Sequence, residues 1–158
     1  MDSKIEPRLD NHFYLKHIQL LANSFFHWTG KHLFDQEEIT ENTARMLYDA
    51  PFALLSHDVK NDPIFNYANK TAQNLFEMSW EQFTQLPSRL SAEPLVREER
   101  QRLLAEVSTN GFINNYSGVR ITRSGKRFHV ENVVVWNIVD ENDQYCGQAA
   151  KIDHWRFI

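Results

Sequence analysis

The stretch of sequence that decides the fold is YANKTAQNLFEMSWEQFTQL, residues 67–86. It begins at the end of an apolar strand, and Asn69 then has a side chain that caps helix starts. The short helix after it places three apolar side chains on one face, namely Ala72, Leu75 and Phe76. Ser79 and Gln82 have the spacing of a capping box, which predicts a second short helix directly after the first.

Upstream of this stretch we expect a loose tail, residues 1–9, and a helical segment, residues 10–50. The first helix has an apolar stripe with spacings of four and three, formed by Tyr14, Ile18, Leu21, Phe25 and Trp28. Gly30 can end this helix. A second helix is expected to begin at Asp35, with Glu38 three residues later as in a capping box.

The remaining residues, 51–158, form the predicted core. Apolar runs at 52–57 and 64–68 flank the turn Asn-Asp-Pro and predict a hairpin. Residues 94–110 have the pattern of the longest helix, and strands are expected over 112–122, 126–139 and 145–155. The fold class is therefore α+β, with an antiparallel sheet of about five strands. Short helices and the long helix cover one face, and the N-terminal helices pack outside.

The strand over residues 126–139 sets the register of the sheet, because its alternate residues point to opposite faces. The even positions carry the more apolar set, which is Phe128, Val130, Asn132, Val134, Trp136 and Ile138. We place this set against the core helices. The odd positions still carry three valines, so the N-terminal helix is expected to cover the other face.

Several short motifs resemble those of a known family: NYANK, LPSRLSAEP, YSGVRI, GKRF, VWN and GQAA. They resemble the MEKHLA domain, within the PAS-like group, and the resemblance is strongest over residues 51–155. It implies a sensory or regulatory module that binds a small molecule between sheet and helices, or a second protein on the sheet. In plants the resembling domain lies at the end of homeodomain-leucine zipper transcription factors.

Composition restricts the class of partner. The chain of 158 residues is 42% hydrophobic and 24% charged, as expected of one globular domain, and its net charge of −4 gives no basic field for nucleic acid. It has one cysteine, no N-terminal signal-peptide pattern and no apolar run long enough for a membrane helix. We therefore expect a cytoplasmic protein with no nucleic-acid and no membrane partner.

Signatures of cofactor, metal and catalytic sites are missing from the sequence. There is no HExxH motif and no GxSxG motif, and His12 and His17 are not spaced as a metal-binding pair. Flavin-binding PAS relatives carry an NCRFLQ-like motif, and haem-binding relatives a histidine on the long core helix; this chain has neither. Cys146 is expected to be a small core residue. We expect no metal, no cofactor and no enzymatic activity.

A pocket in the PAS-like position is expected between the sheet and the helices. Its predicted lining is Leu75, Phe76, Phe83, Val119, Ile121, Asn132, Val134, Trp136 and Gln148. This lining favours a small, uncharged, largely apolar ligand, because an anion would need converging arginines and none is expected inside. Arg120 is assigned with its basic neighbours to a solvated hairpin end. Asn132 either binds the ligand or bonds a neighbour such as Gln148.

Three hypotheses remain open from the sequence. The first is a small-molecule-binding regulatory domain. The second is a ligand-free homodimerisation or protein-interaction domain, in which the stripe from Tyr14 to Trp28 contributes to the interface, because it is too apolar to face water. The third is a small, cone-shaped α+β enzyme, for which a polar pocket with a carboxylate or histidine of shifted pKa would be the distinguishing observation.

Overall fold

The computed structural model describes residues 5–35 and 38–158, and within them the sheet has six antiparallel strands in the order β2-β1-β5-β4-β3, with β6 paired to β4. The strands are β1 (Ala53–His57), β2 (Phe65–Ala68), β3 (Phe112–Ile121), β4 (Arg127–Val139), β5 (Tyr145–Ile152) and β6 (His154–Phe157). The predicted α+β architecture is confirmed. The last predicted strand divides at Asp153 into β5 and β6, which both pair with β4 along the same edge.

The helices follow the predicted order, but the first two begin later than predicted: the first was expected from Asp10, and α1 begins at Leu15 after a 3-10 turn. They are the 3-10 turn η1 (Leu9–Tyr14), α1 (Leu15–Thr29), α2 (Glu41–Tyr48), α3 (Lys70–Phe76), α4 (Trp80–Phe83), the 3-10 turn η2 (Ser88–Ser91) and α5 (Pro94–Asn110). Gly30 ends α1 in the left-handed conformation, as expected. The second helix begins at the capping box of Thr40 and Thr43 rather than at Asp35. Residues 36–37 of the predicted start lie outside the described residues.

Asn69 connects the stretch that decides the fold to the rest of the sheet. Its Oδ1 accepts from the backbone N–H of Ala72, which caps α3, and from that of Leu54 in β1, both at 3.0 Å. Its Nδ2 donates to the carbonyl oxygens of Leu47 and Phe52. The side chain is fully buried, so these four bonds satisfy its polar groups and fix the entry of α3 against β1 and α2.

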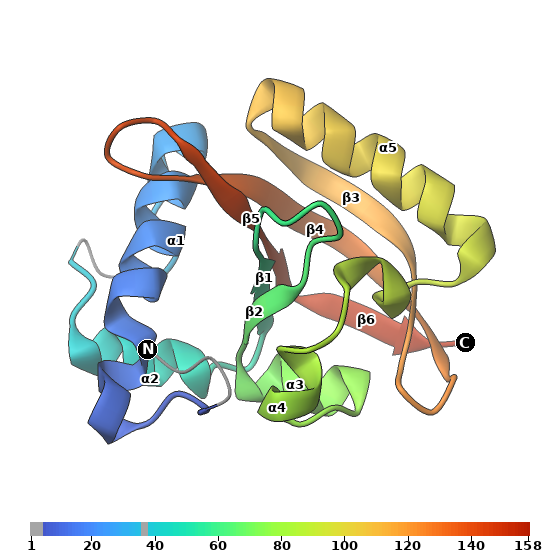
Figure 1. Ribbon diagram of the computed structural model, residues 1–158, viewed down its shortest axis with the longest axis horizontal. Helices are drawn as coiled ribbons and strands as arrows, with labels where there is room; N and C mark the ends of the chain where they lie inside the picture. Colours follow the sequence, from blue (N-terminus) through green and yellow to red (C-terminus); the bar gives the residue numbers. More distant parts are fainter. Residues whose placement is uncertain (1–4, 36–37) are drawn as a thin grey trace.

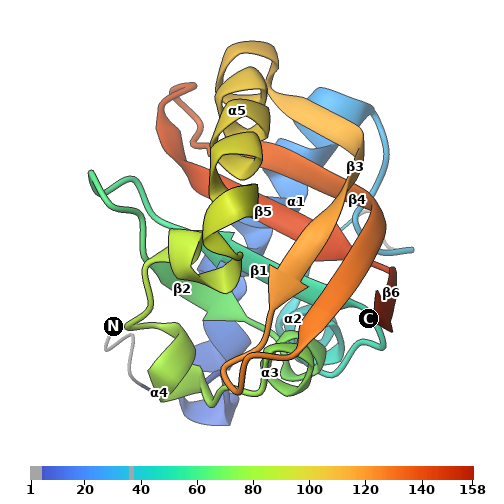
Figure 2. The same ribbon diagram turned by 90° about the vertical axis from the view of Figure 1, so that its right-hand side faces the viewer.

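The sheet is covered on both faces. In Figures 1 and 2, α1 and α2 lie on one side of it, and α3 and α5 lie on the other. Each side has its own apolar core: one core contains Ile18, Leu21 and Trp136, and the other contains Phe76, Val107 and Phe128. The two-sided covering explains why both sets of positions in β4 are apolar.

The apolar stripe of the first helix is buried by its own chain. Tyr14, Ile18, Leu21 and Phe25 are each at most 8% exposed, and the half-buried Trp28 donates from Nε1 to the Asn137 carbonyl at 3.0 Å. The stripe therefore covers the outer face of its own sheet, and its burial does not require a second copy of the chain.

The predicted tail is anchored where the structure describes it. Residues 1–4 lie outside the described residues. The Glu6 carboxylate accepts from the Tyr48 hydroxyl at 2.9 Å and pairs with Lys70 at 3.3 Å. Tyr48 and Lys70 are the main causes that lower the pKa of Glu6. The N-terminal segment is thus fastened to α2 and to the start of α3.

Asn132 interrupts the alternation of β4. Its φ is 53°, in the left-handed region, and the side chain is exposed. Gly118 pairs with Val130 and Tyr116 pairs with Val133, so β4 has one residue more than β3 between these two pairs. This is a β-bulge, and asparagine tolerates its conformation better than other residues with a side chain.

The bulge exchanges the two faces of the strand. Before it, Phe128 and Val130 pack in the core on the α5 side; after it, Val133 and Val135 take that role. Val134 and Trp136 therefore lie in the other core, under α1. The expected register is correct up to Val130 and wrong beyond Asn132, because one inserted residue shifts every later side chain to the opposite face.

The buried amide of β4 is Asn137, not Asn132. Its Oδ1 accepts from Gln148 Nε2 at 3.0 Å, and its Nδ2 donates to the Val107 carbonyl at 2.9 Å. Its backbone N–H donates to the Gly111 carbonyl at 2.8 Å, and its carbonyl accepts from the Trp28 indole. One residue thus joins α5, β5, the start of β3 and α1.

A second polar link joins His17 on α1 to the neighbouring strands β1 and β2. Its Nε2 lies 2.9 Å from Ser56 Oγ, and Ser56 donates to Asn66 Oδ1 at 2.6 Å. Since the serine proton is used in that second bond, the imidazole Nε2 is the donor to Ser56. Desolvation by burial lowers the pKa of His17 to about 4, so the ring is neutral at pH 7.

The bulge generates the first prediction. Replacing Asn132 by Leu removes the side chain that tolerates a positive φ and should destabilise the fold by about 1–2 kcal/mol. Asn132→Gly is the matched control and should lose only a few tenths, because glycine adopts this conformation without strain. Chemical denaturation measures both values. Equal losses for Leu and Gly would show that the conformation at this position is not the constraint.

The neutral His17 generates a prediction about pH. Between its folded pKa of about 4 and its ordinary value of 6.5, the unfolded chain binds more protons than the folded chain. Stability should therefore fall as the pH falls through this window, with His17 contributing about 3 kcal/mol. His17→Gln keeps an amide donor for Ser56 and does not titrate. Denaturation midpoints from pH 7 to pH 4 should decline less in this variant, and parallel curves would contradict the assignment.

Candidate functional site

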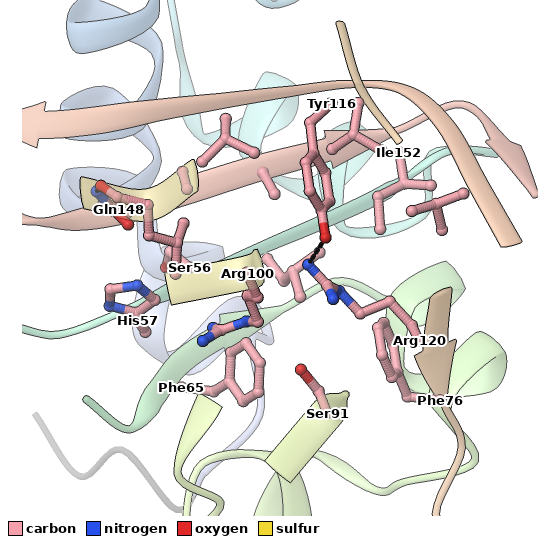
Figure 3. A pocket seen from close by; sticks show the side chains of 17 residues that line it. Ser56, His57, Phe65, Phe76, Ser91, Arg100, Tyr116, Arg120, Gln148 and Ile152 are labelled. Atoms are coloured by element: carbon pink, nitrogen blue, oxygen red, sulfur yellow. Dashed lines mark hydrogen bonds between the residues drawn. The ribbon is translucent and has the colours of Figure 1, made fainter. Parts of the chain in front are cut away.

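A cavity of about 60 Å³ lies between the sheet and the helices on the α5 side. Figure 3 shows the side chains around it. Its apolar lining is Leu55, Phe65, Phe76, Leu104, Val130, Val133, Val135, Ala149, Ala150 and Ile152, and its polar lining is Ser56, His57, Ser91, Arg100, Tyr116, Arg120 and Gln148. The cavity is therefore amphipathic, with polar groups from β1, η2, α5, β3 and β5.

Two of the nine predicted ligand-binding residues, Phe76 and Gln148, line this cavity. Leu75 and Phe83 are buried in the core beside Phe76 but are not part of the lining. Gln148 is held in place, because its Nε2 donates to the Leu104 carbonyl at 3.1 Å as well as to Asn137.

The other five predicted residues lie elsewhere. Asn132 is exposed, and Val134 and Trp136 pack under α1 on the opposite face. Val119 is half-buried outside the lining, and Ile121 borders a separate groove near Met78. The bulge accounts for Asn132, Val134 and Trp136, since the expected lining assumed unbroken alternation along β4.

Alternate residues of β3 bring a polar pair to the cavity. Tyr116, Gly118 and Arg120 occupy positions i, i+2 and i+4, which face the same side of a strand. Arg120 Nη2 donates to the Tyr116 hydroxyl, as the dashed line in Figure 3 marks. A Cβ on Gly118 would lie 2.6 Å from that hydroxyl. The absence of a side chain at Gly118 thus allows Tyr116 to lie along the strand and reach Arg120.

Arg100 enters the cavity from α5. The residue is only 7% exposed and projects toward the cavity in Figure 3. Within the described residues it forms no hydrogen bond and no ion pair. Desolvation, with repulsion from Arg120, lowers the pKa of Arg100 to about 10, so the group is still charged at pH 7.

His57 is the third polar residue at the cavity, and one of its ring nitrogens lacks a hydrogen-bond partner among the described residues. Its Nδ1 lies 2.8 Å from the Asp58 carbonyl, which makes Nδ1 the protonated nitrogen, and its Nε2 is buried without a hydrogen-bond partner among the described residues. Burial is the main cause that lowers the pKa of His57, with a smaller contribution from the charge of Arg100. A neutral ring with an unused acceptor therefore borders the cavity.

The charge balance of the cavity is positive. Two arginines line it, and no carboxylate is among the described residues that do so. Burial is the main cause that lowers the pKa of Arg120, whereas Tyr116 and, to a smaller extent, Glu99 favour its charged form. The expectation that no arginines converge inside is wrong, and Arg120 does not belong to the solvated hairpin end.

The sequence contained a signal for each arginine. Arg100 precedes Leu104 by four residues and Val107 by seven, so it falls on the apolar stripe of its helix. Arg120 alternates with Tyr116 and Gly118 in the motif YSGVRI. A cation on a buried helical stripe and a cation in phase with a buried tyrosine both predict charges that point inward.

Other site types find little support in the described part of the chain. No group of three or more metal-ligating side chains occurs among those residues. None of the described helices is both long and apolar enough to cross a membrane. Cys146 is half-buried, and its Sγ donates to the Gln144 carbonyl at 3.3 Å, outside the cavity.

The family model of the MEKHLA domain matches residues 15–157 of this sequence. The chain belongs to the MEKHLA domain family. Its relatives include the homeobox-leucine zipper protein HOX9 of Oryza sativa subsp. indica, 23% identical over 133 residues, which are 84% of this chain and 16% of HOX9. The homeobox-leucine zipper protein ATHB-9 of Arabidopsis thaliana is 20% identical over 146 residues, 89% of this chain and 17% of that protein. The chain thus spans about a sixth of these relatives.

Solved structures of PAS and light-oxygen-voltage domains share the fold. A PAS domain from Colwellia psychrerythraea matches with a TM-score of 0.61 and 21% identity, over 75% of this chain and 95% of that one. The light-state dimer of the fungal photoreceptor Vivid gives 0.60 and 13%, over 87% and 93%. A PAS domain in complex with ethanol, from a LuxR-family regulator of Burkholderia thailandensis, gives 0.53 and 12%, over 72% and 95%. The PAS-like fold of this MEKHLA domain is therefore established.

The close contact at Gly118 generates a prediction. Gly118→Ala should push the Tyr116 hydroxyl away from Arg120 and destabilise the fold by about 1–2 kcal/mol. In a Tyr116→Phe background the hydroxyl is absent, so the same substitution should have a smaller effect. A double-mutant cycle by chemical denaturation measures the difference. Additive effects would show that Gly118 and the hydroxyl are not coupled.

Proposed function

We propose that this MEKHLA domain is a sensory module that binds a small molecule in the cavity between the sheet and α5. The observation that carries the proposal is a cavity bordered by the buried Nε2 atom of His57, which has no hydrogen-bond partner among the described residues, and by the guanidinium of Arg100, which forms no hydrogen bond to them. Leaving a buried polar group unpaired costs about 1–3 kcal/mol, so a ligand that pairs with these groups gains the corresponding free energy.

The size of the cavity supports a small ligand. About 60 Å³ accommodates roughly four to six water-sized groups. A tricyclic flavin is much larger than this space, and the described lining residues include no cysteine. The similar PAS domain from Burkholderia thailandensis is described in complex with ethanol, a molecule of two carbons. That example supports a small occupant in the present cavity.

Catalysis is the less favoured reading of the same cavity. His57 is a histidine of lowered pKa in a polar pocket, which is the observation that would point to an enzyme. The described lining offers no carboxylate to orient or assist it, and the volume leaves no room for two reactants. We therefore propose that the domain acts by binding and not by catalysis.

Signalling through a protein partner is compatible with ligand binding. The similar Vivid structure is described as a light-state dimer. In the present chain the first-helix stripe is already covered, so a homodimer would use other surfaces, such as the exposed Phe26 on α1 or Leu90 after α4. Ligand-free homodimerisation is the alternative that the experiment below distinguishes.

The test is native mass spectrometry of the protein as purified, which reports bound mass and oligomeric state together. Ala150 lines the cavity, so Ala150→Ile should fill it, abolish any bound mass and keep or raise the melting temperature. Ala105→Ile, at an exposed position of α5, is the control and should retain the bound mass. A dimer without bound mass in the wild-type protein, and no thermal shift with any small-molecule probe, would reject ligand sensing and favour the dimerisation module.

A further inference from the structure

Resting on the function proposed above, we propose that the ligand is a small organic acid. Its carboxylate pairs with Arg100 inside the cavity, and Arg120 is the second cationic group beside it. The remainder of the molecule is a short hydrocarbon chain that lies against the valines of β4.

The need for a negative charge follows from the two arginines. Both line the cavity, and among the described residues neither forms an ion pair there. Arg100 is 7% exposed and Arg120 is half-buried, so both charges have lost part of their solvation. An anion at hydrogen-bond distance from a guanidinium restores that lost solvation. The depressed pKa values of both groups agree with this, because desolvation is their main cause.

The two arginines have different tasks. Arg120 already donates to the Tyr116 hydroxyl and is fixed by it. Arg100 has all its donors unused within the described residues, and its guanidinium is the group that a carboxylate would bind through two parallel hydrogen bonds. Arg100 is therefore the anchor, and Arg120 adds positive potential from β3.

An organic acid is favoured over an inorganic anion by the rest of the lining. Val130, Val133 and Val135 form an apolar wall on β4, which Leu55 and Ile152 extend on β1 and β5. Phosphate would leave this wall in contact with water, whereas a hydrocarbon chain removes it from water. Beside the three heavy atoms of one carboxylate, the volume leaves space for a chain of about three carbons or fewer.

Butyrate is the probe, titrated calorimetrically into the full chain at low ionic strength. 1-Butanol has a similar hydrocarbon without the charge, butylammonium carries the opposite charge, and inorganic phosphate is an anion without hydrocarbon. We expect butyrate to bind at least about tenfold more tightly than 1-butanol, because a hydrogen-bonded charge pair is worth about 1.4 kcal/mol or more. Butylammonium and phosphate should bind more weakly than butyrate.

Substitution of the anchor tests the assignment to Arg100. Arg100→Met has nearly the same length and no charge, so butyrate affinity should fall about tenfold while 1-butanol affinity is unchanged. Arg100→Lys retains a charge and should keep part of the preference for butyrate. Arg102→Met, at an exposed position of the same helix, is the matched control and should change neither affinity.

The melting temperature without ligand distinguishes a binding role from a structural one. Removing a largely desolvated charge that is repelled by Arg120 relieves an unfavourable interaction, so Arg100→Met should raise the melting temperature by about 2–4 °C. An arginine that stabilises the fold would give the opposite sign. A large decrease in the melting temperature of Arg100→Met, or a butyrate affinity unchanged in that variant, would overturn the assignment of Arg100 as a ligand anchor. If Arg100→Met does not fold, a folded Arg100→Lys that binds butyrate no more tightly than 1-butanol would overturn it.

The outcomes separate this inference from the proposed function. If 1-butanol binds as tightly as butyrate, the cavity is a ligand site and the inference of an acid is wrong. If phosphate binds more tightly than butyrate, the site takes inorganic anions and the hydrocarbon part of the inference is wrong. If no probe binds and the purified protein carries no bound mass, both the inference and the proposed function fail.

Discussion

The left-handed backbone of Asn132 is the constraint on which both cores of the domain depend. One extra residue at this point turns Val133 and Val135 toward α5 and Trp136 toward α1. It also coincides with the point where the partner of β4 changes from β6 to β5. Without the bulge, Trp136 would occupy the space where the cavity lies. The local conformation of a single exposed asparagine thus determines that the cavity exists.

The arginines that line the cavity lower the free energy of unfolding of the domain. Native cores rarely hold an arginine, and Arg100, 7% exposed, lines this cavity beside a second arginine and forms no hydrogen bond to the described residues. The second arginine, Arg120, is positioned by the Tyr116 hydroxyl, which has room there because Gly118 has no side chain. Filling the core with apolar side chains would not need this arrangement. Residues that reduce stability and are nevertheless held in a defined geometry are typical of binding sites.

Local signals in the sequence were sufficient for the architecture. The caps at Asn69 and Ser79, the stop at Gly30 and the apolar runs predicted the order of helices and strands, because these features depend on neighbours along the chain. The lining of the cavity was predicted for Phe76 and Gln148 only. For Asn132, Val134 and Trp136 the wrong prediction has one physical cause. A bulge leaves the composition of a strand unchanged, but it changes which side chains point to which face of the sheet. Arg100 was missed because charges were assumed to be solvated, although its position on the helical stripe indicated burial.

Asn137 forms hydrogen bonds to the helices on both faces of the sheet, α5 on one and α1 on the other. Its side chain holds Gln148 at the wall of the cavity, and its backbone carbonyl holds the indole of Trp28 on the outer helix. The cavity and α1 are therefore two ends of one short series of hydrogen bonds that passes through the thickness of the sheet. A molecule that displaces Gln148 breaks one hydrogen bond of Asn137, the residue whose carbonyl holds Trp28 of α1. At Asn137 the sheet connects the cavity on one face to α1 on the other, so a change of packing on one face also affects the other face.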